Sequence, residues 1–159
     1  MGCGKTTVGR RLSYRLKCTM TDTDKVIEKE QDMSISDIFS KYGEPYFRSL
    51  ETDCLEKLIQ IAHEQIISVG GGLPLTEANG PLLKELGKVV FLRVKPETVQ
   101  KRLKGDKTRP LLQGNHPGEK IRELLVIRNP IYEQCADVVI DVDGLTFEQV
   151  LKRIEEAVK

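Results

Sequence analysis

Apolar residues along the chain follow two spacings, one typical of buried strands and the other of helices with one buried face. Short unbroken apolar runs predict strands near residues 66–69, 89–92 and 138–140, and an extended piece near 19–21. Between them, apolar residues recur every three or four positions, as in helices that pack on a core. These helices are expected near residues 4–16, 34–43, 44–62, 76–86, 96–103, 119–132 and 146–158.

Helices and strands alternate along the whole chain, which is the order of the α/β class. We therefore expect a parallel sheet with helices on both faces. There is no internal repeat, linker or low-complexity segment, so residues 1–159 are expected to form one domain. Ligands of such sheets bind at the carboxyl ends of the strands, where functional residues are expected here.

Composition narrows the function classes. The chain has 25 basic and 24 acidic residues, so it has no global field to attract nucleic acid or an anionic membrane, and any anion site must be local. The four cysteines lie far apart and form no C-x-x-C pair, which argues against a zinc site or a disulfide framework. No stretch approaches the roughly 18 apolar residues of a membrane span. We expect a monomeric, cytoplasmic protein with a small-molecule substrate.

A glycine-rich segment opens the first predicted helix. The run Gly2-Cys3-Gly4-Lys5-Thr6-Thr7 matches the end of the phosphate-binding pattern G-x-x-x-x-G-K-[ST]. In that pattern, backbone amides and the helix N-terminus hold phosphate oxygens, the lysine reaches the outer phosphates and the threonine binds Mg²⁺. A glycine turn with a chance Lys-Thr pair is the alternative.

The first glycine of that pattern would lie two residues before Met1, together with the strand that delivers the loop. Such a strand is central and buried, with about five apolar residues each stabilising the fold by roughly 1.5–3 kcal/mol. Its loss approaches the ~5–15 kcal/mol stability of a whole domain. We therefore expect Met1 to be an internal methionine of a longer protein.

Seven motifs in order resemble the shikimate kinase family over the whole chain. They are Gly4-Lys5-Thr6-Thr7-Val8-Gly9-Arg10, Asp22-Thr23-Asp24, Phe47-Arg48 followed by Glu51, Gly70-Gly71-Gly72, Arg109-Pro110-Leu111-Leu112, Arg128-x-Pro-x-Tyr132 and Ala136-Asp137. The resemblance implies a P-loop NTPase-type three-layer fold, here without its first central strand. It also implies substrate-binding helices at about 25–62, a lid at about 104–118, and transfer of a phosphoryl group from ATP, with Mg²⁺, to the 3-hydroxyl of shikimate on the route to aromatic amino acids.

The acceptor side of the site follows from the same resemblance. Asp24 would hold the acceptor hydroxyls and accept the proton, while Asp22 would act at the Mg²⁺ with Thr6. Spacing i, i+2 after a strand lets both carboxylates leave on one side, although an aspartate here can also simply cap the next helix. Arg48 and Arg128 would grip the substrate carboxylate, since a guanidinium supplies a bidentate fork.

Other family positions would serve the substrate and the nucleotide. Gly70, Gly71 and Gly72 would bring backbone amides close to a substrate oxygen, although a flexible turn is the alternative. Arg109 in the lid would stabilise charge during transfer, and closure would exclude water. Arg102 would stack on adenine, with loop 141–144 bordering the base.

Two other functions stay open. A related metabolite kinase, such as a gluconate kinase, could use the same loop and lid. A P-loop relative that has lost catalysis could serve as a nucleotide-binding module. The two arginines and the three glycines favour a compact cyclic carboxylate as the substrate. The loss of catalysis is disfavoured by the presence of Lys5, Thr6, Asp22, Asp24 and Arg109.

Overall fold

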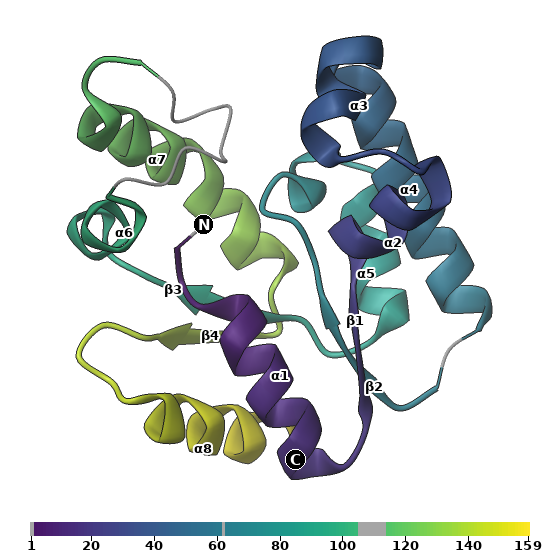
Figure 1. Cartoon of the computed structure of the whole chain (residues 1–159). Coiled ribbons are helices and arrows are strands. Elements are labelled where there is room, and N and C mark those ends of the chain that lie inside the picture. Colours follow the sequence, from purple (N-terminus) through teal and green to yellow (C-terminus); the bar gives the residue numbers. More distant parts are fainter. Residues whose placement is uncertain (1, 62, 105–113) are drawn as a thin grey trace. The chain divides into compact units, whose positions relative to one another are not determined.

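The computed structural model describes residues 2–61, 63–104 and 114–159, which form two compact units (Figure 1). The central unit comprises Thr6–Lys88, and the terminal unit comprises Met1–Lys5 together with Val89–Lys159. Each unit contains two parallel strands and the helices that follow them. The expected α/β architecture is thus present in both.

Helices dominate the central unit. Its elements are α1 (Lys5–Leu16, of which Lys5 belongs to the terminal unit), β1 (Thr19–Asp22), α2 (Thr23–Gln31), α3 (Ile35–Tyr42), α4 (Glu44–Gln60), β2 (Gln65–Ser68), the 3₁₀ helix η1 (Leu73–Leu75) and α5 (Asn79–Leu86). Strands β1 and β2 pair in parallel with Asp22 opposite Ser68. Because both strands end at the same level, the segments that leave them are brought together.

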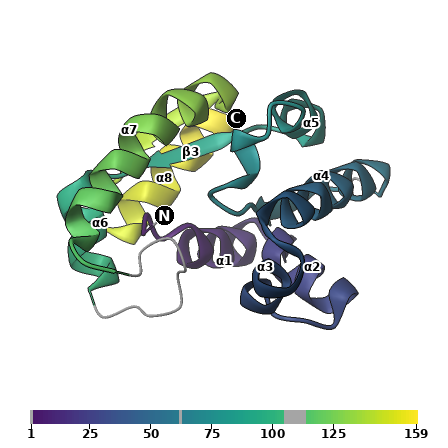
Figure 2. The same ribbon diagram turned by 90° about the horizontal axis from the view of Figure 1, so that it is seen from above.

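The core of the central unit lies between α2, α3 and α4, which Figure 2 shows packed against one another. Its buried members are Ile27, Ile38, Phe47, Cys54 and Leu58. Both predicted ends of α3 are confirmed. The Ser34 hydroxyl accepts a hydrogen bond from the backbone N–H of Asp37, and Gly43 follows the last turn.

The terminal unit contains β3 (Val90–Arg93), α6 (Pro96–Leu103), α7 (Pro117–Cys135), β4 (Val138–Asp141) and α8 (Phe147–Val158). Strands β3 and β4 pair in parallel from Val90 opposite Val138 to Arg93 opposite Asp141. Helices α6 and α7 lie side by side (Figure 2). Its buried apolar residues include Leu92, Val99, Ile121, Leu125, Ile140, Val150, Leu151 and Ile154.

Most predicted elements are confirmed, but two boundaries were wrong. Helix α7 begins at Pro117 rather than near residue 119, so the last residues of the predicted lid are helical. Proline is favoured in a first helical turn because its missing N–H costs no hydrogen bond there. The helix predicted from residue 76 begins only at Asn79, as α5. The short helix η1 precedes it, where the chain turns and the Gly70 carbonyl accepts from the N–H of Leu73.

The four strands of the described residues form two separate pairs rather than one continuous sheet. A parallel sheet without its first central strand was expected from the sequence. No described strand pairs with members of both ladders.

Helix α8 begins with a complete capping box, which generates a stability prediction. The Thr146 hydroxyl accepts from the N–H of Gln149, whose side-chain oxygen accepts from the N–H of Thr146. Thr146→Ala should lower the free energy of unfolding by about 1 kcal/mol. Urea denaturation measures the change. Thr146→Ser, which keeps the hydroxyl, should retain most of the stability, and an equal loss in both variants would contradict this role of the cap.

Candidate active site

The segments that follow β1 and β2 meet at the carboxyl ends of these strands. The carboxylate of Asp22 caps α2 by accepting from the N–H of Asp24 at 3.0 Å, so the capping alternative is realised for Asp22. The fully buried Thr23 donates its hydroxyl to the Ser68 carbonyl and accepts from the N–H of Gly70, both at 3.4 Å. Thr23 thereby ties the acidic segment to the glycine loop.

Charged side chains approach the glycine loop closely. A Cβ at Gly70 would lie 2.9 Å from Oδ1 of Asp24 and 3.2 Å from Oε1 of Glu51. A Cβ at Gly72 would collide with the guanidinium of Arg48. The structure thus gives these glycines a role beyond exposing amides: they leave room for an aspartate, a glutamate and an arginine around one loop.

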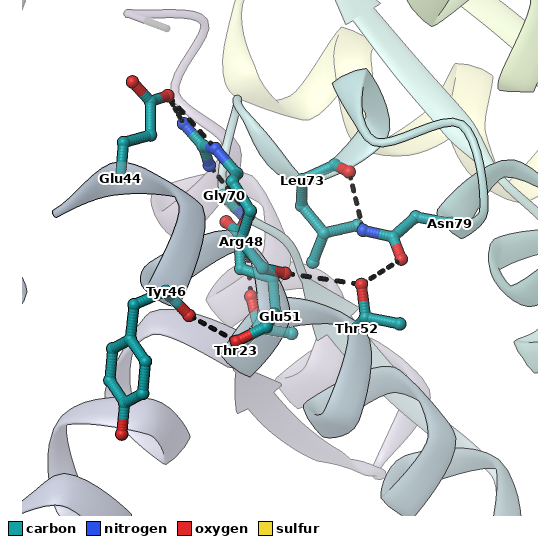
Figure 3. A network of polar contacts seen from close by, with 10 residues as sticks. Thr23, Glu44, Tyr46, Arg48, Glu51, Thr52, Gly70, Leu73 and Asn79 are labelled. Atoms are coloured by element: carbon teal, nitrogen blue, oxygen red, sulfur yellow. Dashed lines mark hydrogen bonds and ion pairs between the residues drawn. The ribbon is translucent and has the colours of Figure 1, made fainter. Parts of the chain in front are cut away.

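Arg48 is held by two carboxylates of its own helix (Figure 3). Nη1 donates to Oε2 of Glu51 at 2.7 Å, and Nη2 and Nε donate to Oε1 of Glu44 at 2.8 and 3.2 Å. The carbon at the centre of the guanidinium lies 5.4 Å from the centroid of the Phe47 ring. A guanidinium has five N–H donors, so one more carboxylate can bind while these three bonds remain.

Glu51 is the most deeply buried charged residue of this cluster, with 1% of its surface exposed. Its Oε1 has no hydrogen-bond partner among the described residues. Burial raises the pKa of Glu51 from 4.5 to about 7; Arg48 opposes the rise, while the negative charges of Asp24 and Glu44 add to it. Its position three residues after Arg48, on the same helical face, was the sequence signal for this ion pair.

A buried amide fixes the far end of the glycine loop, which the sequence analysis missed. Asn79, fully buried at the start of α5, donates Nδ2–H to the carbonyl of Leu73 at 2.9 Å. Its Oδ1 accepts from the hydroxyl of Thr52 on α4 at 2.8 Å (Figure 3). The segment after the glycines is therefore attached to the helix that carries Arg48.

Gly2 and Gly4, which the sequence predicts to bind phosphate, belong to the terminal unit. Both have positive φ, 61° and 84°, a conformation that glycine adopts without strain. Arg102 of α6 donates Nη1–H to the Gly2 carbonyl at 2.9 Å. The Phe147 ring, 39% exposed at the start of α8, lies 3.5 Å from the position of a Cβ on Gly4. Phe147 was not identified from the sequence, because an isolated aromatic at a helix start carries no motif.

The loop that was predicted to border the base makes contacts within the terminal unit. Asp143 accepts from the N–H of Lys95 at 3.0 Å and from the hydroxyl of Thr98 at 2.5 Å, which fixes the start of α6. Asp141 forms a bidentate pair with Arg93 at 2.6 and 2.8 Å. These aspartates therefore shape the loop.

The predicted residues fall into three groups. The central unit brings together Asp22, Asp24, Arg48 and the Gly70–Gly72 loop, and it also contains Thr6 and Thr7 at the start of α1. The terminal unit contains the following residues: Gly2, Cys3, Gly4, Lys5, Arg102 and the buried Arg128 of α7. Arg109 and most of the predicted lid lie outside the described residues.

Burial of Glu51 predicts a pH-dependent contribution to stability. Because the pKa of Glu51 is raised in the folded state, the folded protein keeps the Glu51 carboxyl protonated between pH 4.5 and about 7, whereas the unfolded chain releases the proton. The contribution of Glu51 to folding stability is therefore full below this window and is lost as the pH rises through it. The stability of the native protein relative to Glu51→Gln should fall by about 3 kcal/mol across the window. Urea denaturation at several pH values measures this difference.

The exposed Glu56 of α4 provides the matched control for the loss of one carboxylate. An exposed carboxylate is expected to give a difference in the free energy of unfolding that stays constant with pH. If the difference between the native protein and Glu51→Gln also stays constant with pH, the effect of burial is contradicted.

Comparisons with known proteins identify the family of the chain. The sequence model of the shikimate kinase family matches residues 1–159. Shikimate kinases of Thermodesulfovibrio yellowstonii and Moorella thermoacetica are 45% and 42% identical to the chain, covering 97% and 100% of it and 88% and 90% of their own lengths. The structure of Acinetobacter baumannii shikimate kinase in complex with shikimate superimposes with a TM-score of 0.90 at 37% identity, over 98% of this chain and 87% of the other. The chain belongs to the shikimate kinase family.

Proposed function

We infer that this chain catalyses the ATP-dependent phosphorylation of the 3-hydroxyl of shikimate, a step in the synthesis of aromatic amino acids. Membership of the shikimate kinase family supports the reaction. The observation that carries the assignment to particular residues is the gathering of Asp24, Arg48 and the Gly70–Gly72 loop at the ends of β1 and β2. Phosphoryl transfer depends on such positioning and charge neutralisation, with little covalent work by the protein.

Arg48 is proposed to bind the carboxylate of shikimate. Its guanidinium is largely enclosed and held by Glu44 and Glu51, so it is oriented before the substrate arrives. Preorganisation of this kind lowers the entropy cost of binding. Arg128 is proposed as the second guanidinium of the pair, on the family resemblance, and the amides of the glycine loop as donors to a substrate oxygen.

Asp24 is proposed as the general base. Its carboxylate accepts the proton of the 3-hydroxyl as that oxygen bonds to the γ-phosphorus of ATP. The bond from this phosphorus to the bridging oxygen breaks, and ADP leaves. The closeness of Asp24 Oδ1 to Gly70 supports a base beside the loop that positions the acceptor.

The nucleotide is proposed to bind at residues 2–7. The left-handed glycines and the start of α1 supply amides and a positive helix end for phosphate oxygens, and Lys5 reaches the outer phosphates. Arg102, fixed on the Gly2 carbonyl, and the exposed Phe147 ring are proposed to border the base. Arg109 is proposed, from the family pattern alone, to stabilise charge on the transferred group.

Thr6 and Asp22 would hold Mg²⁺. A hydroxyl and a carboxylate are the hard oxygen ligands that Mg²⁺ prefers, and it usually binds one or two protein oxygens together with substrate phosphates. Asp22 fits, because its cap to the N–H of Asp24 uses only Oδ1 and a carboxylate accepts several bonds. When bound, the ion would neutralise charge on the phosphates.

Three further properties remain predictions. A cytoplasmic location and the absence of nucleic-acid or membrane partners are expected from composition, and a monomeric state is an expectation without a structural test. Among residues 2–61, 63–104 and 114–159, no helix has the length and apolarity needed to cross a membrane.

ADP release by the full-length protein with shikimate, with gluconate or without an acceptor tests the proposed function. Turnover with shikimate is expected. Turnover with gluconate alone would identify a different metabolite kinase, and ATP binding without turnover on any acceptor would indicate a nucleotide-binding module.

Asp24→Asn should reduce kcat by roughly a hundredfold or more, since general base catalysis contributes about 10²–10⁴-fold. ATP binding, measured by titration of a fluorescent analogue, should stay close to that of the native protein. Lys5→Ala is the contrasting variant, in which nucleotide binding itself should weaken. Normal turnover in Asp24→Asn would remove its assignment as the base.

Gly72→Ala should raise the KM for shikimate on the order of tenfold to a hundredfold, the value of one or two charge-assisted hydrogen bonds. The added methyl would displace the guanidinium of Arg48 that lies against Gly72. Steady-state kinetics at saturating ATP measures the effect. Gly87→Ala is a control glycine change at the end of α5, where nothing lies within 4 Å of a Cβ. Because Gly87 has a φ of 159°, alanine there can lower stability, but it should leave this KM unchanged.

A further inference from the structure

The carboxylate of Glu51 has two oxygens in different surroundings. Oε2 accepts a hydrogen bond from Nη1 of Arg48 at 2.7 Å. Oε1 is buried, has no hydrogen-bond partner among the described residues, and lies within 3.2 Å of the position of a Cβ on Gly70. Oε2 is therefore paired with a guanidinium, whereas Oε1 is an acceptor that no donor of the described residues reaches.

Negative charge exceeds positive charge around Glu51. On its own helix it faces Arg48, Glu44 and the thiol of Cys54; from the start of α2 it faces Asp24. The glycine loop after β2 adds backbone but no charge at Gly70. The guanidinium of Arg48 thus already binds two carboxylates, those of Glu44 and Glu51, before any acidic ligand arrives.

We propose that binding of the shikimate carboxylate at Arg48 is coupled to the uptake of one proton from solvent by Oε1 of Glu51, so that substrate affinity falls as pH rises above neutrality. This inference rests on the proposed function, since it needs an acidic substrate at Arg48. The proton adds to a carboxylate oxygen, and the buffer supplies it. By becoming neutral, Glu51 would compensate for the negative charge that the substrate carboxylate brings to this site.

Burial and charge determine the direction of this coupling. The pKa of Glu51 is already raised to about 7 by burial, against the opposing effect of Arg48. A third carboxylate on the same guanidinium raises this pKa further, because it repels the negative charge of Glu51 and shares the positive charge of Arg48. Between the free and bound values the complex holds a proton that the free protein lacks, and linkage then requires the Kd to rise with pH, by up to about tenfold per pH unit.

Glu44 also bonds Arg48, but it is less suited to take up a proton when the substrate binds. Half of its side-chain surface is exposed, against 1% for Glu51, so water screens its charge. This difference provides a matched pair of variants within one ion cluster: Glu51→Gln and Glu44→Gln each remove one carboxylate from Arg48.

Isothermal titration calorimetry with shikimate and the full-length protein tests the coupling. Binding enthalpies in phosphate and in Tris, which differ in ionisation enthalpy, give the number of protons taken up per bound shikimate. We expect little uptake below about pH 6, where Glu51 is already protonated, and an uptake approaching one proton above about pH 7. Glu51→Gln should abolish the uptake and the rise of Kd with pH, whereas Glu44→Gln should keep both.

The outcomes separate this inference from the proposed function. Binding of shikimate with no proton uptake, or uptake that persists in Glu51→Gln, would overturn the coupling and leave the kinase assignment intact. Failure of shikimate to bind or react at any pH would overturn the function itself. If Glu51→Gln does not fold, carbon NMR of the native protein with labelled glutamate carboxyls decides: one glutamate must titrate near 7 and shift upward on adding shikimate.

Discussion

The burial of the Glu51 carboxylate beside Arg48 is the interaction on which the central-unit site depends. Removing a carboxylate and a guanidinium from water is costly, and their attraction compensates only when geometry is good. Here the helix supplies the geometry, because residues three positions apart share one face. The result is an arginine whose guanidinium is fixed against a glycine loop rather than moving in solvent.

The strand register explains why that arginine is placed near Asp24. Asp22 and Ser68 are opposite one another in the β1–β2 pair, so α2 and the glycine loop start from the same level. Thr23, the first residue of α2, bonds the end of β2 and the glycine loop, and Asn79 attaches the end of the loop to α4. Two buried polar side chains, neither of them charged, thus hold together three elements that carry the functional groups.

Much of this arrangement could be predicted from the sequence, and the reasons are local. The helix ends followed from Ser34 and Gly43, and the strands from short apolar runs. The phosphate loop and the Asp22–Asp24 pair are compact motifs in which spacing alone indicates chemistry. Tertiary contacts were harder to predict. Thr23 and Asn79 are ordinary polar residues in the sequence, and their roles depend on which backbone groups the fold places beside them.

The raised pKa of Glu51 could not be predicted either, since it results from burial and from a carboxylate 27 residues away in α2. The sequence indicated only that Glu51 lies one turn from Arg48. Likewise, the need for glycine at positions 70 and 72 was assigned to substrate contact, whereas the structure adds the close approach of the protein's own side chains.

Helix α6 is attached at both ends. Asp143 fixes its first turn through Lys95 and Thr98, and Arg102 in its last turn holds the Gly2 carbonyl. The turn after β4 is therefore connected to the backbone at Gly2 through the two turns of α6. If the nucleotide binds at Gly2 as proposed, natural variation in that turn would alter ATP affinity without any contact between the varied side chain and the ligand.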